Sequence, residues 1–109
     1  MARKGELEKV LNARLVRHFK KLQKDGHQIK WYKTHGGPYS SQAGTPDFHV
    51  TYYGQSFWFE MKTIDYKPQP LQIVELRRWQ AAGAITGLCY SVEDVTKILD
   101  KFRQERGIV

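Results

Sequence analysis

The stretch Gly44–Lys62, GTPDFHVTYYGQSFWFEMK, decides how the rest of this chain is interpreted. Aromatic and β-branched residues fill most of it, and Gly54-Gln55 interrupts them near the middle. Such a pattern predicts two strands, over residues 47–53 and 56–63, joined by a two-residue turn that begins with glycine. The stretch therefore predicts a β-hairpin.

Charged residues lie at the open end of this hairpin, where burial costs free energy unless each charge has a partner. Side chains alternate between the two faces of a strand, so Glu60 and Lys62 share one face. The apolar side chains at alternate positions of Phe57–Met61 form the opposite, core-facing side. With the turn at Gly54-Gln55, Asp47 lies opposite Lys62 and diagonal to Glu60.

Two explanations fit this grouping. Neighbouring carboxylates repel each other unless a cation or a proton lies between them, and their oxygens suit a hard ion such as Mg²⁺ or Mn²⁺. Such an ion polarises a phosphate and lowers the pKa of bound water, while a nearby lysine orients that water or offsets developing charge. The residues therefore resemble a site for metal-assisted phosphodiester hydrolysis. A weak cross-strand ion pair of Asp47 with Lys62, on the open face of a sheet, explains the spacing equally well.

Helical and strand patterns alternate along the rest of the chain. The expected elements are a helix over 5–24, a strand over 27–33, the hairpin, a helix over 70–82, a strand over 85–90 and a final helix opened by Ser91. A loop rich in Gly, Ser and Pro separates the first strand from the hairpin. The order α-β-β-β-α-β-α predicts an α/β fold, and 109 residues suit a single domain over 1–109.

The composition excludes several classes of protein. Hydrophobic residues make up 40% of the chain, which is enough for a modest core and too many for a disordered chain. No apolar run approaches the roughly 20 residues of a membrane span, and the N-terminus lacks the apolar segment of a signal peptide. The single cysteine, Cys89, excludes an internal disulfide and suits a reducing cytosol. We therefore expect a cytoplasmic protein without a membrane partner.

Positive charge is concentrated in the first third of the chain. The net charge is +7, and residues 1–33 hold ten Lys or Arg against three acids, which already gives +7. A basic region of this kind favours binding to a polyanion, most often nucleic acid. A solvated, lysine-rich helix has the same composition, so the charge alone leaves both interpretations open.

Pro46-Asp47, followed by Glu60-Met61-Lys62, resembles the PD-(D/E)XK nuclease signature. Four longer segments, WYKTHGGPYSSQAGTPDFHV, GQSFWFEMKT, PLQIVELRRWQAAGA and YSVEDVTKIL, are similar to the virus-type replication-repair nuclease (VRR-NUC) family, in matching order over nearly the whole chain. The resemblance implies a restriction-endonuclease-like core with a mixed central sheet flanked by helices. It also implies DNA phosphodiester cleavage that depends on Mg²⁺, with Mn²⁺ as a substitute.

The resemblance assigns roles to individual residues. Asp47 and Glu60 would bind the metal together with the backbone carbonyl of Met61, and Lys62 would serve the attacking water. Gln72, at the start of the helix that follows the motif, would hold water or phosphate. Without the resemblance, this glutamine is interpreted as a solvated polar residue.

The family also places an acid on the first helix, near the start of its apolar stripe. Glu8 fits this position best, as a further metal ligand and catalytic residue, and Glu6 is the alternative. An acid near a helix N-terminus is also favoured by the helix dipole alone.

DNA contacts are expected from basic residues of the first and second helices and from residues before and within the long loop. They are Arg14, Arg17, Lys20, Lys21, Lys24, Arg77, Arg78, Lys33, His35 and Tyr39. For His35 and Tyr39 the alternative is a loop position without contact to DNA.

Short stand-alone members of the family are similar to phage-encoded enzymes that act as dimers on branched DNA. The resemblance thus implies a homodimeric, structure-selective endonuclease, a Holliday junction resolvase, in a phage- or bacterial-type host cytosol. Two alternatives stay open: a nuclease of the same fold for flaps, nicks or single strands, and a catalytically silent DNA-binding module.

Overall fold

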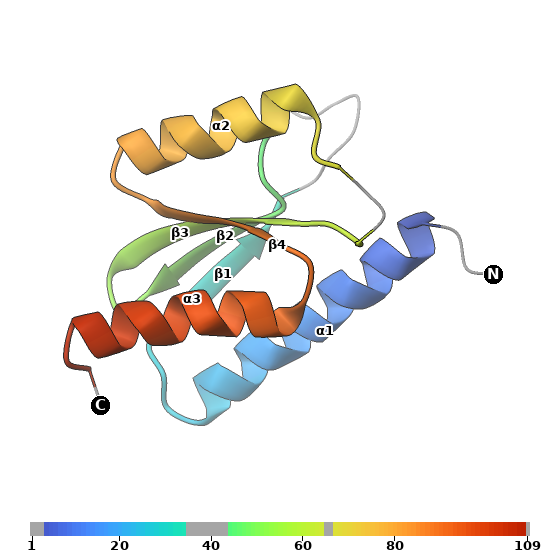
Figure 1. Ribbon diagram of the computed structural model, residues 1–109. Coiled ribbons are helices and arrows are strands. Elements are labelled where there is room, and N and C mark those ends of the chain that lie inside the picture. The colour runs from blue at the N-terminus through green and yellow to red at the C-terminus, as the bar shows by residue number, and fades with distance from the viewer. Residues whose placement is uncertain (1–3, 35–43, 65–66, 109) are drawn as a thin grey trace.

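The computed structural model describes residues 4–34, 44–64 and 67–108, and its helices and strands follow the predicted order (Figure 1). The elements are α1 (Lys4–Lys24), β1 (Ile29–Lys33), β2 (Phe48–Tyr52), β3 (Gln55–Met61), α2 (Pro70–Ala81), β4 (Ile85–Cys89) and α3 (Val92–Glu105). The predicted boundaries lie within two residues of these, and several coincide with them. Within the described residues, no helix combines the length and apolarity needed to cross a bilayer.

The four strands form one mixed sheet in the order β1-β2-β3-β4. The pairs β1–β2 and β2–β3 are antiparallel, whereas β3 and β4 are parallel. The parallel pair is connected by α2, which crosses one face of the sheet, while α1 and α3 lie together on the other face (Figure 1). Because β3 and β4 run in the same direction, both end at the end of the sheet where β2 begins.

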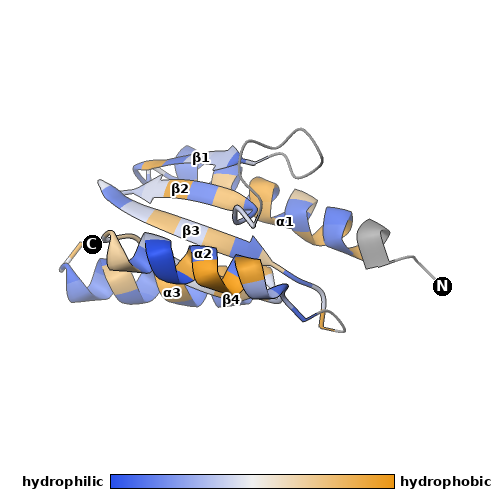
Figure 2. Ribbon diagram, turned by 90° about the horizontal axis from the view of Figure 1, so that it is seen from above, coloured by the Kyte–Doolittle hydropathy of each residue, from blue (hydrophilic) through white to orange (hydrophobic). Residues whose placement is uncertain are grey.

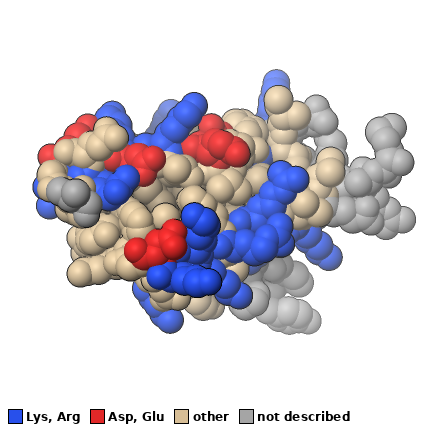
Figure 3. Space-filling model, turned by 90° about the horizontal axis from the view of Figure 1, so that it is seen from below, with Lys and Arg blue, Asp and Glu red and all other residues tan. Residues whose placement is uncertain are grey.

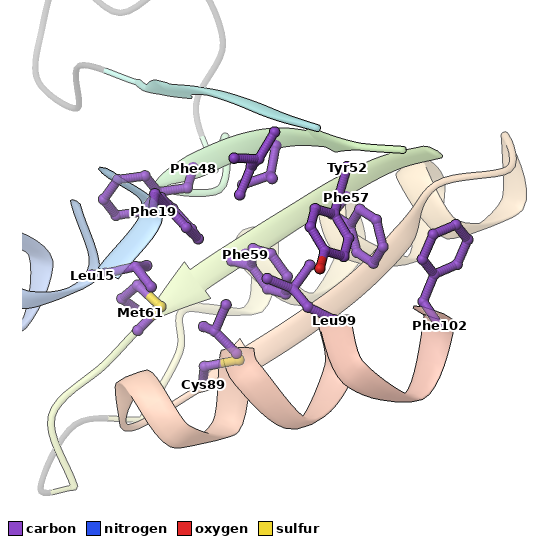
Figure 4. Packing of buried hydrophobic residues seen from close by; sticks show 13 residues of the cluster. Leu15, Phe19, Phe48, Tyr52, Phe57, Phe59, Met61, Cys89, Leu99 and Phe102 are labelled. Carbon is purple, nitrogen blue, oxygen red and sulfur yellow. The ribbon is translucent and has the colours of Figure 1, made fainter. Parts of the chain in front are cut away.

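The main core is a layer of apolar side chains between the sheet and the α1–α3 face (Figure 4). The members labelled in Figure 4 are Leu15, Phe19, Phe48, Tyr52, Phe57, Phe59, Met61, Cys89, Leu99 and Phe102. The α1 members recur at a four-residue spacing, and the β2 and β3 members recur at alternate positions. These spacings place each set on one face of its element, which is why the sequence pattern predicted a helix and two strands.

The opposite face of the sheet is covered only in part. Trp58 of β3 packs with Leu76 of α2 and with Ala84, and the ring centroids of Trp58 and Trp79 are 4.5 Å apart. Figure 2 shows β1 and β2 beyond the edge of α2, and Tyr32 of β1 is 59% exposed. The strand β3 is therefore buried on both faces, which its sequence alternation did not predict.

The hairpin turn differs from the prediction by one residue. Tyr52 pairs with Gln55, so the turn residues are Tyr53 and Gly54, with φ angles of 47° and 82°. Two positive φ angles are typical of the type I′ turns that match the twist of the flanking strands. A tyrosine is uncommon in this conformation. Here its ring packs against the rings of His27 and Tyr52, and these tertiary contacts stabilise it.

The observed turn also changes the register of the hairpin. Phe48 pairs with Phe59, so continuing the strands by one residue places Asp47 opposite Glu60. The prediction that Asp47 lies opposite Lys62 is therefore wrong. A shift of two positions along β3 keeps the same face, because side chains alternate with a period of two. The two carboxylates remain on one face and come closer together than predicted.

Candidate active site

The two carboxylates and the lysine singled out in the sequence lie together where β3 ends and β2 begins. The Lys62 Nζ atom is 3.8 Å from Glu60 Oε1. Asp47 Oδ2 accepts a hydrogen bond of 2.8 Å from the backbone N–H of Met61, the residue between the other two. The structure thus brings together the three side chains that the hairpin pattern grouped, and their catalytic roles stay predictions.

Backbone contacts fix the position of Asp47. Thr34, directly after β1, donates its N–H to the carbonyl oxygen of Asp47 (2.8 Å) and its hydroxyl to that of Pro46 (2.7 Å). Pro46 is fully buried, and its ring restricts φ. Gly44, with a φ of 80°, lies so close to α2 that a Cβ atom would be 2.8 Å from the Leu71 side chain. These contacts hold the Asp47 carboxylate against the end of β3.

Glu60 is a fully buried carboxylic acid without a hydrogen-bond donor. Its exposed fraction is 0%, and neither carboxyl oxygen receives a hydrogen bond from the described residues. Burial, then sharing of a proton with the Asp47 carboxyl and repulsion by its charge, raise the pKa of Glu60 to about 9, while attraction to Lys62 acts in the opposite direction. Ionised carboxylates are acceptors only, so Asp47 and Glu60 can be joined only by a shared proton or by a cation.

Lys62 completes this group from the end of β3. Its side chain is only 12% exposed, and its backbone N–H donates to the carbonyl oxygen of Cys89 in β4 (2.9 Å). No ion pair joins Asp47 and Lys62 in the part of the chain that the structure describes, and Glu60 is buried beneath neighbouring side chains. The alternative of a weak surface ion pair on an open sheet face is therefore wrong.

The oxygen donors suit a small, hard divalent cation. Glu60 offers two oxygens without donors, and Asp47 offers the oxygen that does not accept from Met61. Over residues 4–34, 44–64 and 67–108, no three His, Cys, Asp or Glu side chains are grouped closely enough for an all-protein metal site. Two carboxylates match the usual Mg²⁺ site, in which waters and substrate phosphates complete the coordination.

Glu8 of α1 approaches the carboxylate pair without joining it. Its negative charge is the smallest of the causes that raise the pKa of Glu60, which places Glu8 within electrostatic range. The side chain is half-buried. Its role as a metal ligand stays a prediction. The side chain of the alternative acid, Glu6, lies outside the described residues.

Two further predicted site residues contribute mainly through structure. The Gln72 Oε1 atom accepts the backbone N–H of Gln69 (2.8 Å) and caps the start of α2. The amide nitrogen of Gln72 donates no hydrogen bond to the described residues, and its contact with water or phosphate stays a prediction. The Met61 side chain lies in the main core, so only its backbone reaches the carboxylates.

The basic residues predicted to bind DNA do not form one surface. Arg14 and Arg17 border a groove between α1 and the start of α3, together with Tyr90, which follows β4. Figure 3 shows Lys and Arg side chains gathered over part of the face that α1 and α3 form. This groove begins beside the end of β4, which pairs with the end of β3, so it lies at the same end of the sheet as the carboxylates.

The other basic residues lie on different parts of the surface. Lys20, Lys21 and Lys24 are at the C-terminal end of α1, and at 1.5 Å per residue Lys24 is roughly 24 Å along the helix from Glu8. Lys21 also pairs with Asp25 (3.3 Å). Arg77 and Arg78 are on α2, on the other side of the sheet (Figure 1), and Arg78 pairs with Glu75 (3.0 Å). His35 and Tyr39 lie outside the described residues.

Sequence reasoning missed two residues of this region. The Thr34 hydroxyl donates to the carbonyl oxygens of Pro46 and Asp47, but a threonine after a strand gives no sequence signal of such a role. Asn12 is only 9% exposed. A sequence signal for it existed, because it follows Glu8 by one helical turn and occupies a core position of the α1 apolar stripe.

Comparison with solved structures identifies the fold. The chain is similar to a solved structure described as a VRR_NUC domain, with a TM-score of 0.64 and 24% sequence identity. The match covers 85% of this chain and 94% of that chain. The chain has the fold of a VRR_NUC domain. The VRR_NUC fold fits the restriction-endonuclease-like core expected from the sequence. No family model matches the chain, and no curated protein matches it.

Proposed function

We propose that this protein is a metal-dependent, structure-selective DNA endonuclease that hydrolyses phosphodiester bonds in branched DNA, and that four-way junctions are its substrate. The observation that carries the proposal is the buried Glu60, whose carboxyl oxygens lack donors, beside Asp47 and Lys62. Buried polar groups almost always have partners, so a buried carboxyl without one calls for a ligand. The solved VRR_NUC domain with the same fold supports a nuclease.

Each of the three side chains has a role in this proposal. Asp47 and Glu60 would hold Mg²⁺ or Mn²⁺ through the oxygens that accept no hydrogen bond. The bound ion supplies positive charge and a Lewis acid at the scissile phosphate. Lys62 keeps its ammonium group 3.8 Å from Glu60 Oε1, where it orients the attacking water and stabilises negative charge that develops on the phosphate. The buried surroundings strengthen both electrostatic interactions.

Symmetric cleavage of a junction requires two active sites, and we propose that the enzyme supplies them as a C₂ homodimer. Sedimentation analysis at micromolar concentration tests this directly. A monomer that still cuts both strands of a junction would contradict it.

A cleavage assay on a panel of DNA structures tests the function. The substrates are end-labelled four-way junctions, flaps, nicked duplexes and single strands, each incubated with Mg²⁺, with Mn²⁺ or with a chelator. We expect metal-dependent cutting, fastest on the four-way junction, and no cutting by Asp47→Asn. Faster cutting of flaps, nicks or single strands replaces the proposed substrate with one of these. Binding to DNA without cutting in any divalent metal contradicts the endonuclease and favours a silent DNA-binding module.

A further inference from the structure

A second groove beside the candidate active site carries polar groups that the proposed hydrolysis does not use. It lies between α1 and the end of β1 and is lined by Lys9, Asn12, Ala13 and Val16 on one side and by Lys33 on the other. Its volume is about 270 Å³, which is enough for a phosphate group with its waters. It is distinct from the groove that Arg14 and Arg17 border on the other flank of α1.

The stability of the fold does not explain why the buried residue at position 12 of this groove is an asparagine. It is 9% exposed, and its Oδ1 atom is buried without a hydrogen-bond partner among the described residues. Asparagine is a poor helix former, and an unpaired buried amide costs stability. An alanine or leucine at this position of the α1 stripe would avoid both costs. Oδ1 and Nδ2 of an amide can be exchanged, so either a donor or an acceptor of Asn12 is available to a ligand.

Two lysines add positive charge to the same groove. Neither the Lys9 nor the Lys33 ammonium forms an ion pair with a carboxylate in the described part of the chain. The Lys33 Nζ atom lies 5.9 Å from the ring centroid of Phe48, so it is held beside the start of β2, on the face of the sheet that α1 covers. Glu8, which precedes Lys9 on α1, raises the pKa of Glu60 by repulsion, so its charge is within electrostatic range of the candidate active site. The groove therefore combines a neutral hydrogen-bonding group with two cations that have no ion-pair partner among the described residues.

We propose that this groove binds a backbone phosphate of the DNA strand, next to the scissile phosphate, with Lys9 and Lys33 as cations and Asn12 as the neutral donor. Phosphate oxygens are acceptors only, and contacts of this kind position a nucleic acid without reading its sequence. The inference rests on the proposed function, because the groove lies at the same end of the sheet as the carboxylates that would cut the strand. Asn12 and Lys9 are then residues that position the DNA strand.

DNA binding without metal tests the groove separately from catalysis. The probe is a fluorescein-labelled four-way junction, and its dissociation constant is measured by anisotropy in a chelating buffer over a range of salt concentrations. We expect Lys9→Gln and Lys33→Gln each to weaken binding about threefold to tenfold and to reduce the slope of log K against log salt by about 1, because one fewer counterion is released. Asn12→Ala should weaken binding about fivefold and leave the slope unchanged, because a neutral amide releases no counterion.

The matched control is Lys101→Gln. Lys101 is an exposed lysine of α3, paired with Glu105 at 3.9 Å, and lies away from both grooves of α1. It should bind the junction like the unaltered protein. If Asn12→Ala fails to fold, the two exposed lysine variants still decide the question.

Two patterns of results separate this inference from the proposed function. Lysine variants with unchanged affinity and slope overturn the phosphate site, even if the unaltered protein cuts DNA. The expected losses of affinity, in a protein that cuts no substrate in any divalent metal, support the phosphate site and overturn the endonuclease. An Asn12→Ala variant with unaltered affinity removes Asn12 from the site.

Discussion

The two ends of the β2–β3 hairpin differ in whether their polar groups have hydrogen-bond partners within the chain. At the turn end, Tyr52 is 1% exposed and its hydroxyl lies 2.7 Å from His27 Nδ1. Gln55 of the same end donates to the carbonyl oxygen of Gly83 (2.9 Å). At the open end, Glu60 is equally buried, yet neither of its oxygens receives a hydrogen bond from the described residues.

Within this single hairpin, the turn end has a structural role and the open end holds the candidate active site. Paired polar groups fix the turn and the register, and they need nothing from outside the chain. A buried carboxyl that accepts no hydrogen bond, with only the Lys62 ammonium 3.8 Å away, costs free energy that a proton or a further cation can offset. The open end is therefore the part of the sheet where we expect a ligand. The experiments below test this difference between the two ends.

Glu60→Gln should have the largest effect on cleavage. The amide removes one negative charge from the metal site, so we expect the rate of junction cleavage in Mg²⁺ to fall by about 10³-fold or more. The melting temperature without metal should stay the same or rise, because a neutral group replaces a buried acid. Glu105→Gln, at an exposed acid of α3, is the control and should change neither quantity. Loss of cleavage together with a large loss of stability would mean that Glu60 acts through folding.

Lys62→Met should lower the cleavage rate by about 10²-fold, because the variant keeps the length of the side chain and loses its positive charge. Anisotropy in a chelating buffer should show junction affinity within about twofold of the unaltered protein. Equal cleavage rates for the variant and the unaltered protein would refute the role of this lysine at the open end.

The pH dependence of stability should also distinguish the two ends. The pKa of Glu60 is raised in the folded protein, so between its unfolded and folded values the folded state binds more protons than the unfolded state. The free energy of unfolding therefore falls as pH rises through this range. Burial lowers the pKa of His18 and His49, which adds the opposite slope below about pH 6.5, so the useful window is above about pH 7.

Thermal unfolding over this window is the measurement. Without metal, the melting temperature should fall from about pH 7 to about pH 8.5, and Mg²⁺ should reverse the fall by binding the ionised carboxylates. Glu60→Gln should remove both the slope and the stabilisation by Mg²⁺. A slope that survives this substitution would assign the titration to another group.

Tyr52→Phe should have the smallest effect, and only on stability. The substitution removes the hydrogen bond to His27 and leaves that ring nitrogen without its partner. We expect a loss of about 1 kcal/mol in the free energy of unfolding by chemical denaturation. The cleavage rate should not change, because the turn is at the far end of the hairpin from the carboxylates. A comparable loss of cleavage would show that the two ends are not independent.

Local sequence patterns were predictable, whereas contacts between distant parts of the chain were not. The alternation in the hairpin and the apolar stripes of the helices are local patterns, so they predicted the element order and the grouping of Asp47, Glu60 and Lys62. The register was wrong because the turn at Tyr53-Gly54 depends on rings that come from elsewhere in the fold. No local pattern shows such a contact.

The sequence also did not predict that both faces of β3 are buried, or how the basic residues are distributed over the surface. The alternation of β3 predicts one buried face, and the packing of α2 makes the second face buried as well. The basic residues from Arg14 to Lys24 form one cluster in the sequence, but a helix spreads them over roughly 15 Å, and its direction decides which of them approach the carboxylates. The unpaired Asn12 became informative only when its burial was known.

The central claim is that the open end of the hairpin is a divalent metal site. Anomalous diffraction from a crystal soaked in Mn²⁺ tests it most directly, with a Glu60→Gln crystal as the control. We expect an anomalous peak in contact with the carboxylates of Asp47 and Glu60, and no peak there in the control. A soaked crystal that diffracts well and shows no peak between these carboxylates, or a peak that persists in the control, would contradict the account.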